Sequence, residues 1–193
     1  FKTNNTSSNK LITTDKKPII AILPGSRKQE IKKILNTVIE TVKYFKEYQF
    51  IVAGAPNIDL SYYTSIIKNK KIKVIENKTY ELLSVSYAAI VTSGTATLET
   101  ALFKVPQVVC YKSSYFSFVI AKLIVNIKYI SLVNLIMDQE IVKELIQQDC
   151  NKNKITKELK KILDLNHRKS LKVKYDELTS ILGNFGTSKR VAL

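Results

Sequence analysis

The stretch Pro18-Ile-Ile-Ala-Ile-Leu-Pro-Gly-Ser-Arg27 decides the fold of this chain. Its continuous apolar run predicts a strand that is covered on both faces, as in a parallel sheet. Pro24-Gly25 then turns the chain, and Ser26 followed by Gln29 is typical of a capping box that opens a helix at about Arg27. A strand, a tight turn and a helix in this order predict the first βα unit of an α/β fold.

The same alternation continues along the chain. We expect further strands at 49–53, 72–75, 88–92 and 105–111, with helices between them at 60–67, 80–86 and 95–103. Strands and helices that alternate at this spacing predict a Rossmann-like, doubly wound parallel sheet. Its right-handed crossovers bring the strand-to-helix turns to one edge. Beyond Tyr111 the pattern favours a helical C-terminal tail, with helices at 117–125, 138–147, 156–163 and 171–182 and with Gly183 and Gly186 as stop signals.

The composition supports this class and excludes others. The chain has 193 residues, of which 45% are hydrophobic and 24% charged, as in ordinary globular proteins. Two cysteines and one histidine exclude a disulfide-rich scaffold and a His/Cys zinc site. No signal peptide is visible, and the most apolar region, 116–137, is interrupted by lysines and asparagines that disfavour a membrane span.

We divide the chain into three parts. Residues 1–17 are polar and are expected to form a linker or tail. Residues 18–150 are expected to form the Rossmann-like lobe, and residues 151–193 to form C-terminal helices that pack on it.

The net charge of +15, from 31 basic and 16 acidic residues, has two interpretations. It favours anionic partners such as phosphorylated substrates, nucleic acid or an anionic membrane surface. Alternatively, it reflects drift towards lysine, which A/T-rich triplets encode. Only three arginines are present, and nucleic-acid readers depend on arginine, so we expect no nucleic acid among the partners.

Two turns on the expected ligand edge could bind an anion. Gly25, Ser26 and Arg27 stand at a helix start, where free amide groups and a forked guanidinium suit phosphate oxygens. The alternative there is an ordinary capped turn with a solvated arginine. The run Ser93-Gly94-Thr95-Ala96 begins the helix at 95–103 in the same way, and its alternative is a turn of small residues.

Two further polar side chains could contact the same ligand. Glu99 lies one helical turn beyond Thr95, where its carboxylate can accept hydrogen bonds from both hydroxyls of a ribose. Asn134 is a polar residue in an apolar stretch, and either bonds a ligand or is a satisfied core asparagine.

Five motifs in order carry a family resemblance: Leu23-Pro-Gly-Ser-Arg27, Ser93-Gly-Thr-Ala-Thr-Leu-Glu99, Pro106-Gln-Val-Val-Cys-Tyr111, Tyr129-Ile-Ser-Leu-Val-Asn-Leu-Ile136 and Glu140-Ile-Val-Lys-Glu-Leu-Ile-Gln-Gln148. Over roughly residues 18–150 they resemble the C-terminal half of the lipid-A-disaccharide synthase family. The resemblance implies the C-terminal lobe of a GT-B fold in an inverting hexosyltransferase. That family transfers 2,3-diacylglucosamine from UDP-2,3-diacylglucosamine to lipid X, which yields tetraacyl-disaccharide 1-phosphate and UDP, without a metal or other cofactor.

The resemblance also implies roles for single residues. The UDP-binding set would be Gly25, Ser26, Arg27, Ser93, Gly94, Thr95, Ala96 and Glu99. Arg27 would face the diphosphate, Glu99 would hold the ribose and Asn134 would line the cleft, with Arg27 and Asn134 as the catalytic residues of this lobe. The general base is expected in the N-terminal lobe of the family, which is absent from these residues, so we expect the chain alone to be inactive.

The resemblance further implies partners and a location. The partners would be the UDP-sugar and lipid X, an anionic membrane surface and the missing N-terminal lobe, and a homodimer is an option. The protein would be cytoplasmic and peripheral at the inner face of the inner membrane of a Gram-negative-type bacterium. Some apolar side chains of 116–137 could contact acyl chains there.

Two alternatives stay open at this point. One is the donor lobe of another GT-B enzyme, such as the N-acetylglucosaminyltransferase that acts on undecaprenyl-muramyl-pentapeptide. The other is a noncatalytic basic Rossmann module that binds RNA, which would show a steep dependence of affinity on salt.

Overall fold

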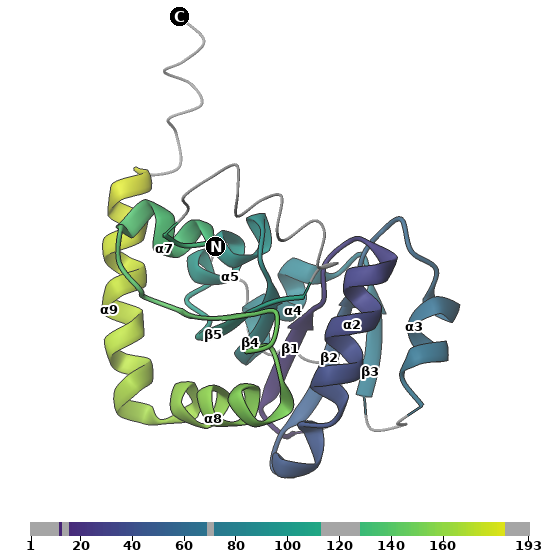
Figure 1. The fold of residues 1–193 in the computed structure, drawn as a ribbon. Coiled ribbons are helices and arrows are strands. Elements are labelled where there is room, and N and C mark those ends of the chain that lie inside the picture. Colours follow the sequence, from purple (N-terminus) through teal and green to yellow (C-terminus); the bar gives the residue numbers. More distant parts are fainter. Residues whose placement is uncertain (1–11, 13–15, 69–71, 113–127, 184–193) are drawn as a thin grey trace, which may run out of the picture.

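A parallel sheet of six strands forms the centre of the structure, a computed structural model that describes residues 12, 16–68, 72–112 and 128–183 (Figure 1). The strands lie in the order β3-β2-β1-β4-β5-β6, and every neighbouring pair is parallel. Their bounds are β1 (Ile19–Leu23), β2 (Gln49–Gly54), β3 (Ile72–Glu76), β4 (Ser86–Thr92), β5 (Gln107–Tyr111) and β6 (Lys143–Ile146). The predicted doubly wound Rossmann-like sheet is therefore confirmed.

Helices follow the strands along the chain. Their bounds are α2 (Lys28–Ile39), the 3-10 turn η1 (Val42–Tyr44), α3 (Leu60–Ile66), α4 (Thr79–Val85), α5 (Thr95–Leu102), α7 (Leu132–Met137), α8 (Lys152–Leu163) and α9 (Leu165–Leu182). The helices predicted at 60–67, 80–86 and 95–103 correspond to α3, α4 and α5 within one residue.

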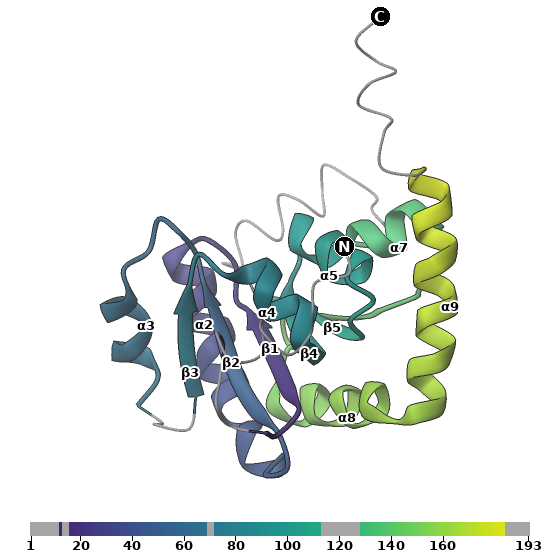
Figure 2. The same cartoon turned by 180° about the vertical axis from the view of Figure 1, so that it is seen from behind.

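The helices cover both faces of the sheet (Figures 1 and 2). Successive side chains of a strand point to opposite faces, so Ile20 and Ile22 of β1 pack with α2, α3 and α8, whereas Ile19, Ala21 and Leu23 pack with α4. On that second face, the part of the sheet around β5 is covered by α5, α7 and α9. All five residues of β1 are buried, as the uninterrupted apolar run predicts.

The two C-terminal helices are integral to these layers. Ile155 and Leu159 of α8 are fully buried in the core shared with α2, and Tyr175 and Leu178 of α9 are fully buried in the cluster on the other face. Asn151 and Asp164 cap these helices, so both begin earlier than the predicted 156 and 171, and Gly183 ends α9 as expected. Ile12, from the stretch expected to be a linker, is also fully buried, beside β1 and α4.

Two local predictions are wrong. The stretch 138–147 is not a helix, because Asp138 adopts a left-handed conformation and 143–146 pair with β5 as the edge strand β6. Ser26 and Gln29 form no capping box, because the N-cap of α2 is Arg27 and no side chain caps this helix. The helix predicted at 117–125 and the stop signal Gly186 lie outside the described residues.

Candidate functional site

The candidate site lies at the point where the strand order of the sheet reverses. β2 and β3 lie on one side of β1, and β4, β5 and β6 lie on the other. β1 pairs with β2 on one side and with β4 on the other, and Leu23 stands beside Val91 at their carboxyl ends. β1 leads into α2 on one face of the sheet, and β4 leads into α5 on the opposite face. The two turns therefore diverge from adjacent strand ends, which is the place where doubly wound sheets bind ligands.

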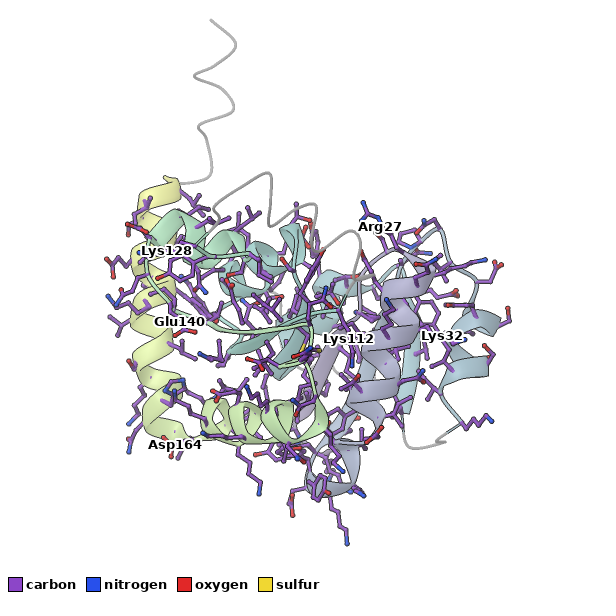
Figure 3. The ribbon with its side chains drawn as sticks, in the orientation of Figure 1. Arg27, Lys32, Lys112, Lys128, Glu140 and Asp164 are labelled. Carbon is purple, nitrogen blue, oxygen red and sulfur yellow. The ribbon has the colours of Figure 1, made fainter. Side chains whose placement is uncertain are left out.

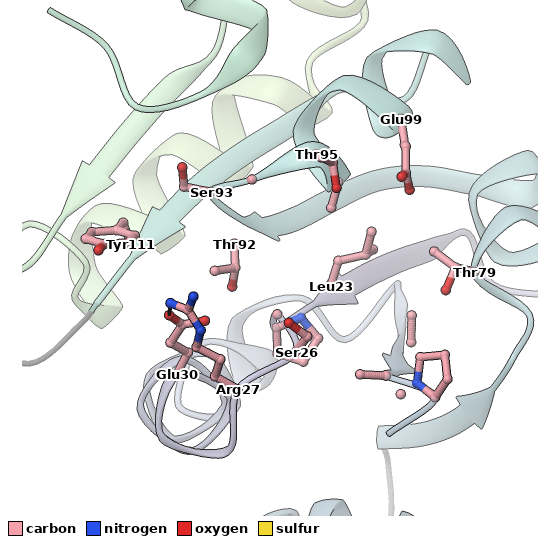
Figure 4. Close-up of a pocket in the computed structure, with 18 residues that line it drawn as sticks. Leu23, Ser26, Arg27, Glu30, Thr79, Thr92, Ser93, Thr95, Glu99 and Tyr111 are labelled. Carbon is pink, nitrogen blue, oxygen red and sulfur yellow. Dashed lines mark hydrogen bonds and ion pairs between the residues drawn. The ribbon is translucent and has the colours of Figure 1, made fainter. Parts of the chain in front are cut away.

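A cavity of about 500 Å³ opens between these turns. Figure 4 shows Arg27 and Ser26 on one side of it and Ser93, Thr95 and Glu99 on the other. All eight residues of the predicted UDP-binding set line this cavity: Gly25, Ser26, Arg27, Ser93, Gly94, Thr95, Ala96 and Glu99. The structure thus brings together two motifs that lie about seventy residues apart in the sequence.

Both long helices that begin at the cavity start without a side-chain cap. Arg27 and Gly94 are the N-cap residues of α2 and α5, and neither helix start receives a side-chain hydrogen bond. Helices α3 and α4 also start without a side-chain cap, whereas α7, α8 and α9 are capped by the side chains of Ser131, Asn151 and Asp164. The first amide groups of α2 and α5 are therefore left for solvent or a ligand, and the helix dipole favours an anion there.

Glycine is required in both turns. Gly25 has φ +95°, and a Cβ there would stand 3.3 Å from an Oε2 of Glu30 and 3.4 Å from a methyl of Thr92. Gly94 has φ +145° and open space where its Cβ would be. Both positions thus need a conformation that side chains disfavour, and Gly25 also allows the turn to pack against β4.

The cavity holds one cation and two carboxylates among its described lining residues: Arg27, Glu30 and Glu99. Arg27 donates a hydrogen bond to Glu30 at 3.3 Å, and its side chain is 81% exposed. Such an exposed ion pair contributes little free energy, so the guanidinium can exchange this carboxylate for another anion at small cost. Backbone amides would have to supply most of the attraction for a diphosphate.

Sequence reasoning missed part of the lining. Glu30, Thr79, Thr92, Tyr111 and the turn 53–56 also face the cavity. All except Glu30 follow or end a strand at the same edge of the sheet, a position that could have identified them. Thr92 is 5% exposed, and its Oγ1 has no hydrogen-bond partner among the described residues.

Asn134 lies outside the lining of this cavity. It is fully buried in α7, and its amide nitrogen donates to the carbonyl of Val142 and to Glu144, both at 2.8 Å. Its Oδ1 accepts from the amides of Ile141 at 2.8 Å and Val142 at 2.9 Å. The structure therefore shows Asn134 as a satisfied core amide outside the lining of this cavity.

The described residues offer neither a metal site nor a membrane span. They contain no group of three or more His, Cys, Asp or Glu side chains arranged to hold a metal ion. Among the same residues, no helix is both long and apolar enough to cross a membrane.

The family model and two curated relatives that match this sequence carry the name of one enzyme family. The family model described as lipid-A-disaccharide synthetase matches residues 1–191. The lipid-A-disaccharide synthase of Anaeromyxobacter dehalogenans (strain 2CP-C) is 34% identical over 181 residues, which are 90% of this chain and 47% of that protein. The one from Coxiella burnetii (strain Dugway 5J108-111) is 35% identical, over 91% of this chain and 48% of that protein. The chain thus spans about half the length of the curated relatives it matches.

Solved structures show the same fold at low sequence identity. The C-terminal CMP-Kdo binding domain of WaaA from Acinetobacter baumannii matches 93% of this chain and 96% of its own length, with TM-score 0.60 and 13% identity. The glycotransferase of kitacinnamycin matches 93% of this chain and 43% of its own length, with TM-score 0.64 and 9% identity. The fold is therefore that of a GT-B glycosyltransferase lobe. Because the family model matches nearly the whole sequence, this chain belongs to the lipid-A-disaccharide synthase family.

Proposed function

We propose that this chain is the donor-binding part of an enzyme of lipid A biosynthesis. The enzyme would transfer 2,3-diacylglucosamine from UDP-2,3-diacylglucosamine to lipid X, which yields tetraacyl-disaccharide 1-phosphate and UDP. One observation carries the proposal: two helix starts without side-chain caps face one cavity beside Arg27 and Glu99. Family membership favours this reaction over the muramyl-pentapeptide alternative.

In this proposal the diphosphate lies between the two turns. The amides at Gly25, Ser26, Thr95 and Ala96 and the guanidinium of Arg27 donate hydrogen bonds to its oxygens. Glu99, one turn into α5, accepts hydrogen bonds from the ribose hydroxyls. The buried hydroxyl of Thr92 lies between both turns, and a phosphate oxygen would supply the partner that it lacks.

The reaction itself needs little more from this lobe. The acceptor hydroxyl of lipid X attacks the anomeric carbon from the side opposite the diphosphate, and loses its proton to a base on the N-terminal lobe. The bond from that carbon to the diphosphate oxygen breaks, and UDP leaves with the electron pair. The amides and Arg27 stabilise the developing negative charge, so the anomeric configuration is inverted without a metal.

The enzyme would also depend on a second lobe and on a membrane surface. The chain would act only together with an N-terminal lobe, and a homodimer stays an option. Its net charge of +15 suits an anionic membrane, so we place the enzyme in the cytoplasm, peripheral at the inner face of the inner membrane of a Gram-negative-type bacterium. Both acyl-chain substrates would be reached there.

Calorimetry with UDP tests the donor site. Arg27→Ala and Glu99→Ala should each weaken UDP binding by about 10-fold or more, because each removes a charged hydrogen-bonding group worth about 1.5–3 kcal/mol. The matched controls are Lys32→Ala, which removes the same charge on an exposed position of α2 away from the cavity (Figure 3), and Glu81→Ala at an exposed position of α4. Both controls should leave UDP affinity unchanged.

Other outcomes would favour the alternatives. Unchanged UDP affinity in both site variants, with circular dichroism and melting intact, would refute the assignment of the site. Binding of a short RNA with a steep salt dependence, and no signal with UDP, would favour the RNA-binding module. A product assay on the complete two-lobed enzyme, with lipid X and the muramyl-pentapeptide lipid as acceptors, decides which transfer it performs.

A further inference from the structure

Ser93 lines the cavity, but it has no proton left to give to a phosphate. Its hydroxyl donates to the carbonyl of Ile130 at 2.6 Å, and its amide donates to the carbonyl of Cys110 at 3.2 Å. Phosphate oxygens are acceptors and need a donor. Ser93 therefore serves the site by fixing its own turn, and the anchor of that turn is a residue 37 positions later in the chain.

The anchor at Ile130 is itself held by one carboxylate. Glu144, on β6, accepts hydrogen bonds from the Ile130 amide at 2.9 Å, the Ser131 amide at 2.9 Å, the Ser131 hydroxyl at 2.8 Å and the Asn134 side-chain amide at 2.8 Å. Hydrogen bonds to an ionised acceptor are roughly twice as strong as neutral ones. This concentration of donors fixes the position of the 130–131 backbone.

The strand geometry explains why Glu144 can reach these groups. Side chains alternate along β6, so Leu145 packs into the core beside α8 while Glu144 points to the face that carries α7. Pairing of β6 with β5 sets Glu144 opposite Val109, one residue before the Cys110 carbonyl that receives the Ser93 amide. Both anchors of Ser93 thus belong to one connected framework.

We infer that Glu144 is a positioning residue for the ligand-binding turn at 93–96. It holds Ile130 in place, Ile130 holds the Ser93 hydroxyl, and Ser93 aims the free amides at the start of α5 into the cavity. Gly94 has φ +145° and open space where a Cβ would stand, so no neighbouring group packs on that side of the turn. The identity of the ligand as UDP rests on the proposed function, whereas the positioning of the turn does not.

The first test measures the turn without any ligand. In Glu144→Gln, the side-chain amide group would face donors, so at least one hydrogen bond to 130–131 is lost. We expect hydrogen exchange of the Ser93 amide to accelerate by about 10-fold, because the turn opens more often. The matched control is Glu140→Gln, which removes the same charge from an exposed residue paired with Lys143 at 2.7 Å. Equal exchange in wild type and Glu144→Gln would overturn the inference.

The second test is a double-mutant cycle on UDP affinity. Ser93→Ala and Glu144→Gln should each weaken UDP binding by about 10-fold, and the double variant should be no weaker than either alone, because both break one chain of contacts. If the two substitutions act independently, the double variant loses about 100-fold in UDP affinity, and this result would overturn the proposed chain of contacts from Glu144 to Ser93. If Glu144 had only a structural role, Glu144→Gln would lower the melting temperature. It would then weaken UDP affinity by the same factor whether residue 93 is serine or alanine.

Two further outcomes are separated by design. If wild type binds no UDP, the proposed function fails, and the exchange of the Ser93 amide still decides the positioning role. If Glu144→Gln does not fold, Ser131→Ala replaces it, since this variant leaves the carboxylate in place. It removes one donor to Glu144 and also the hydroxyl that accepts from the Asn134 amide at the start of α7. It should accelerate exchange at Ser93 by about 3-fold, in proportion to one weaker contact, and no acceleration would overturn the inference.

Discussion

Replacement of Asn134 by alanine separates a structural role for this residue from a catalytic one. The variant removes four hydrogen bonds of 2.8 to 2.9 Å at a fully buried position. The amides of Ile141 and Val142 and the carbonyl of Val142 then lose these partners. Each buried group left unsatisfied costs about 1–3 kcal/mol, and part of this cost is relieved by relaxation, so we expect a loss of about 3–5 kcal/mol in unfolding free energy.

Urea unfolding followed by circular dichroism measures this loss. For a chain of this size the slope of free energy with urea is about 2 kcal/mol per molar, so the midpoint should fall by about 1.5–2.5 M. The control is Asn36→Ala on an exposed position of α2, which should change the free energy by less than about 0.5 kcal/mol. Asn134→Asp should also destabilise the fold, because it sets a second carboxylate against Glu144.

One result would refute this reasoning. If Asn134→Ala costs less than about 1 kcal/mol, the hydrogen bonds around this side chain do not hold the 134–144 segment as the structure indicates. If the same variant, in the complete enzyme, keeps its stability and loses only sugar transfer, the catalytic role expected from the family resemblance is correct.

Three other perturbations have defined outcomes. Gly25→Ala should weaken UDP binding and cost about 1–2 kcal/mol, because φ +95° disfavours a Cβ that would also press on Glu30; calorimetry and urea unfolding check this, and unchanged values for both would show that the turn adapts freely. Leu159→Ala should cost about 2–5 kcal/mol, since the side chain is fully buried beneath the sheet, whereas Val173→Ala at a 66% exposed position should cost far less in the same assay. Burial and nearby Lys161 lower the pKa of His167, so the unfolded chain binds a proton at this side chain more readily than the folded chain does. The free energy of unfolding should therefore fall as the pH drops through about 6.5 towards the pKa of the folded state. His167→Gln should reduce the difference in urea midpoint between acidic and neutral pH, and an unchanged difference would contradict this role of His167.

The amino-acid sequence determined the repeating strand-helix pattern and the place of the two ligand-facing turns. Long apolar runs such as Ile19–Leu23 indicate strands buried on both faces, and the glycines that follow them mark the turns. Parallel pairing and right-handed crossovers then leave few arrangements, so the meeting of Arg27 and Glu99 at one cavity could be predicted. These signals are local, and a handful of topological rules converts them into a fold.

Only the tertiary structure decided the stretch from Asp138 to Gln147, and with it the roles of the polar residues around it. Its one lysine, two glutamates and one leucine favour a helix locally, but residues 143–146 pair with the free edge of β5 and form β6. The pairing of β6 sets Glu144 against the turn at 130–131 and beside the buried Asn134. The Ile130 carbonyl of that turn accepts the hydrogen bond from the Ser93 hydroxyl. Such assignments depend on contacts between residues far apart in the chain, whose energies exceed local propensity and leave no periodic trace in the sequence.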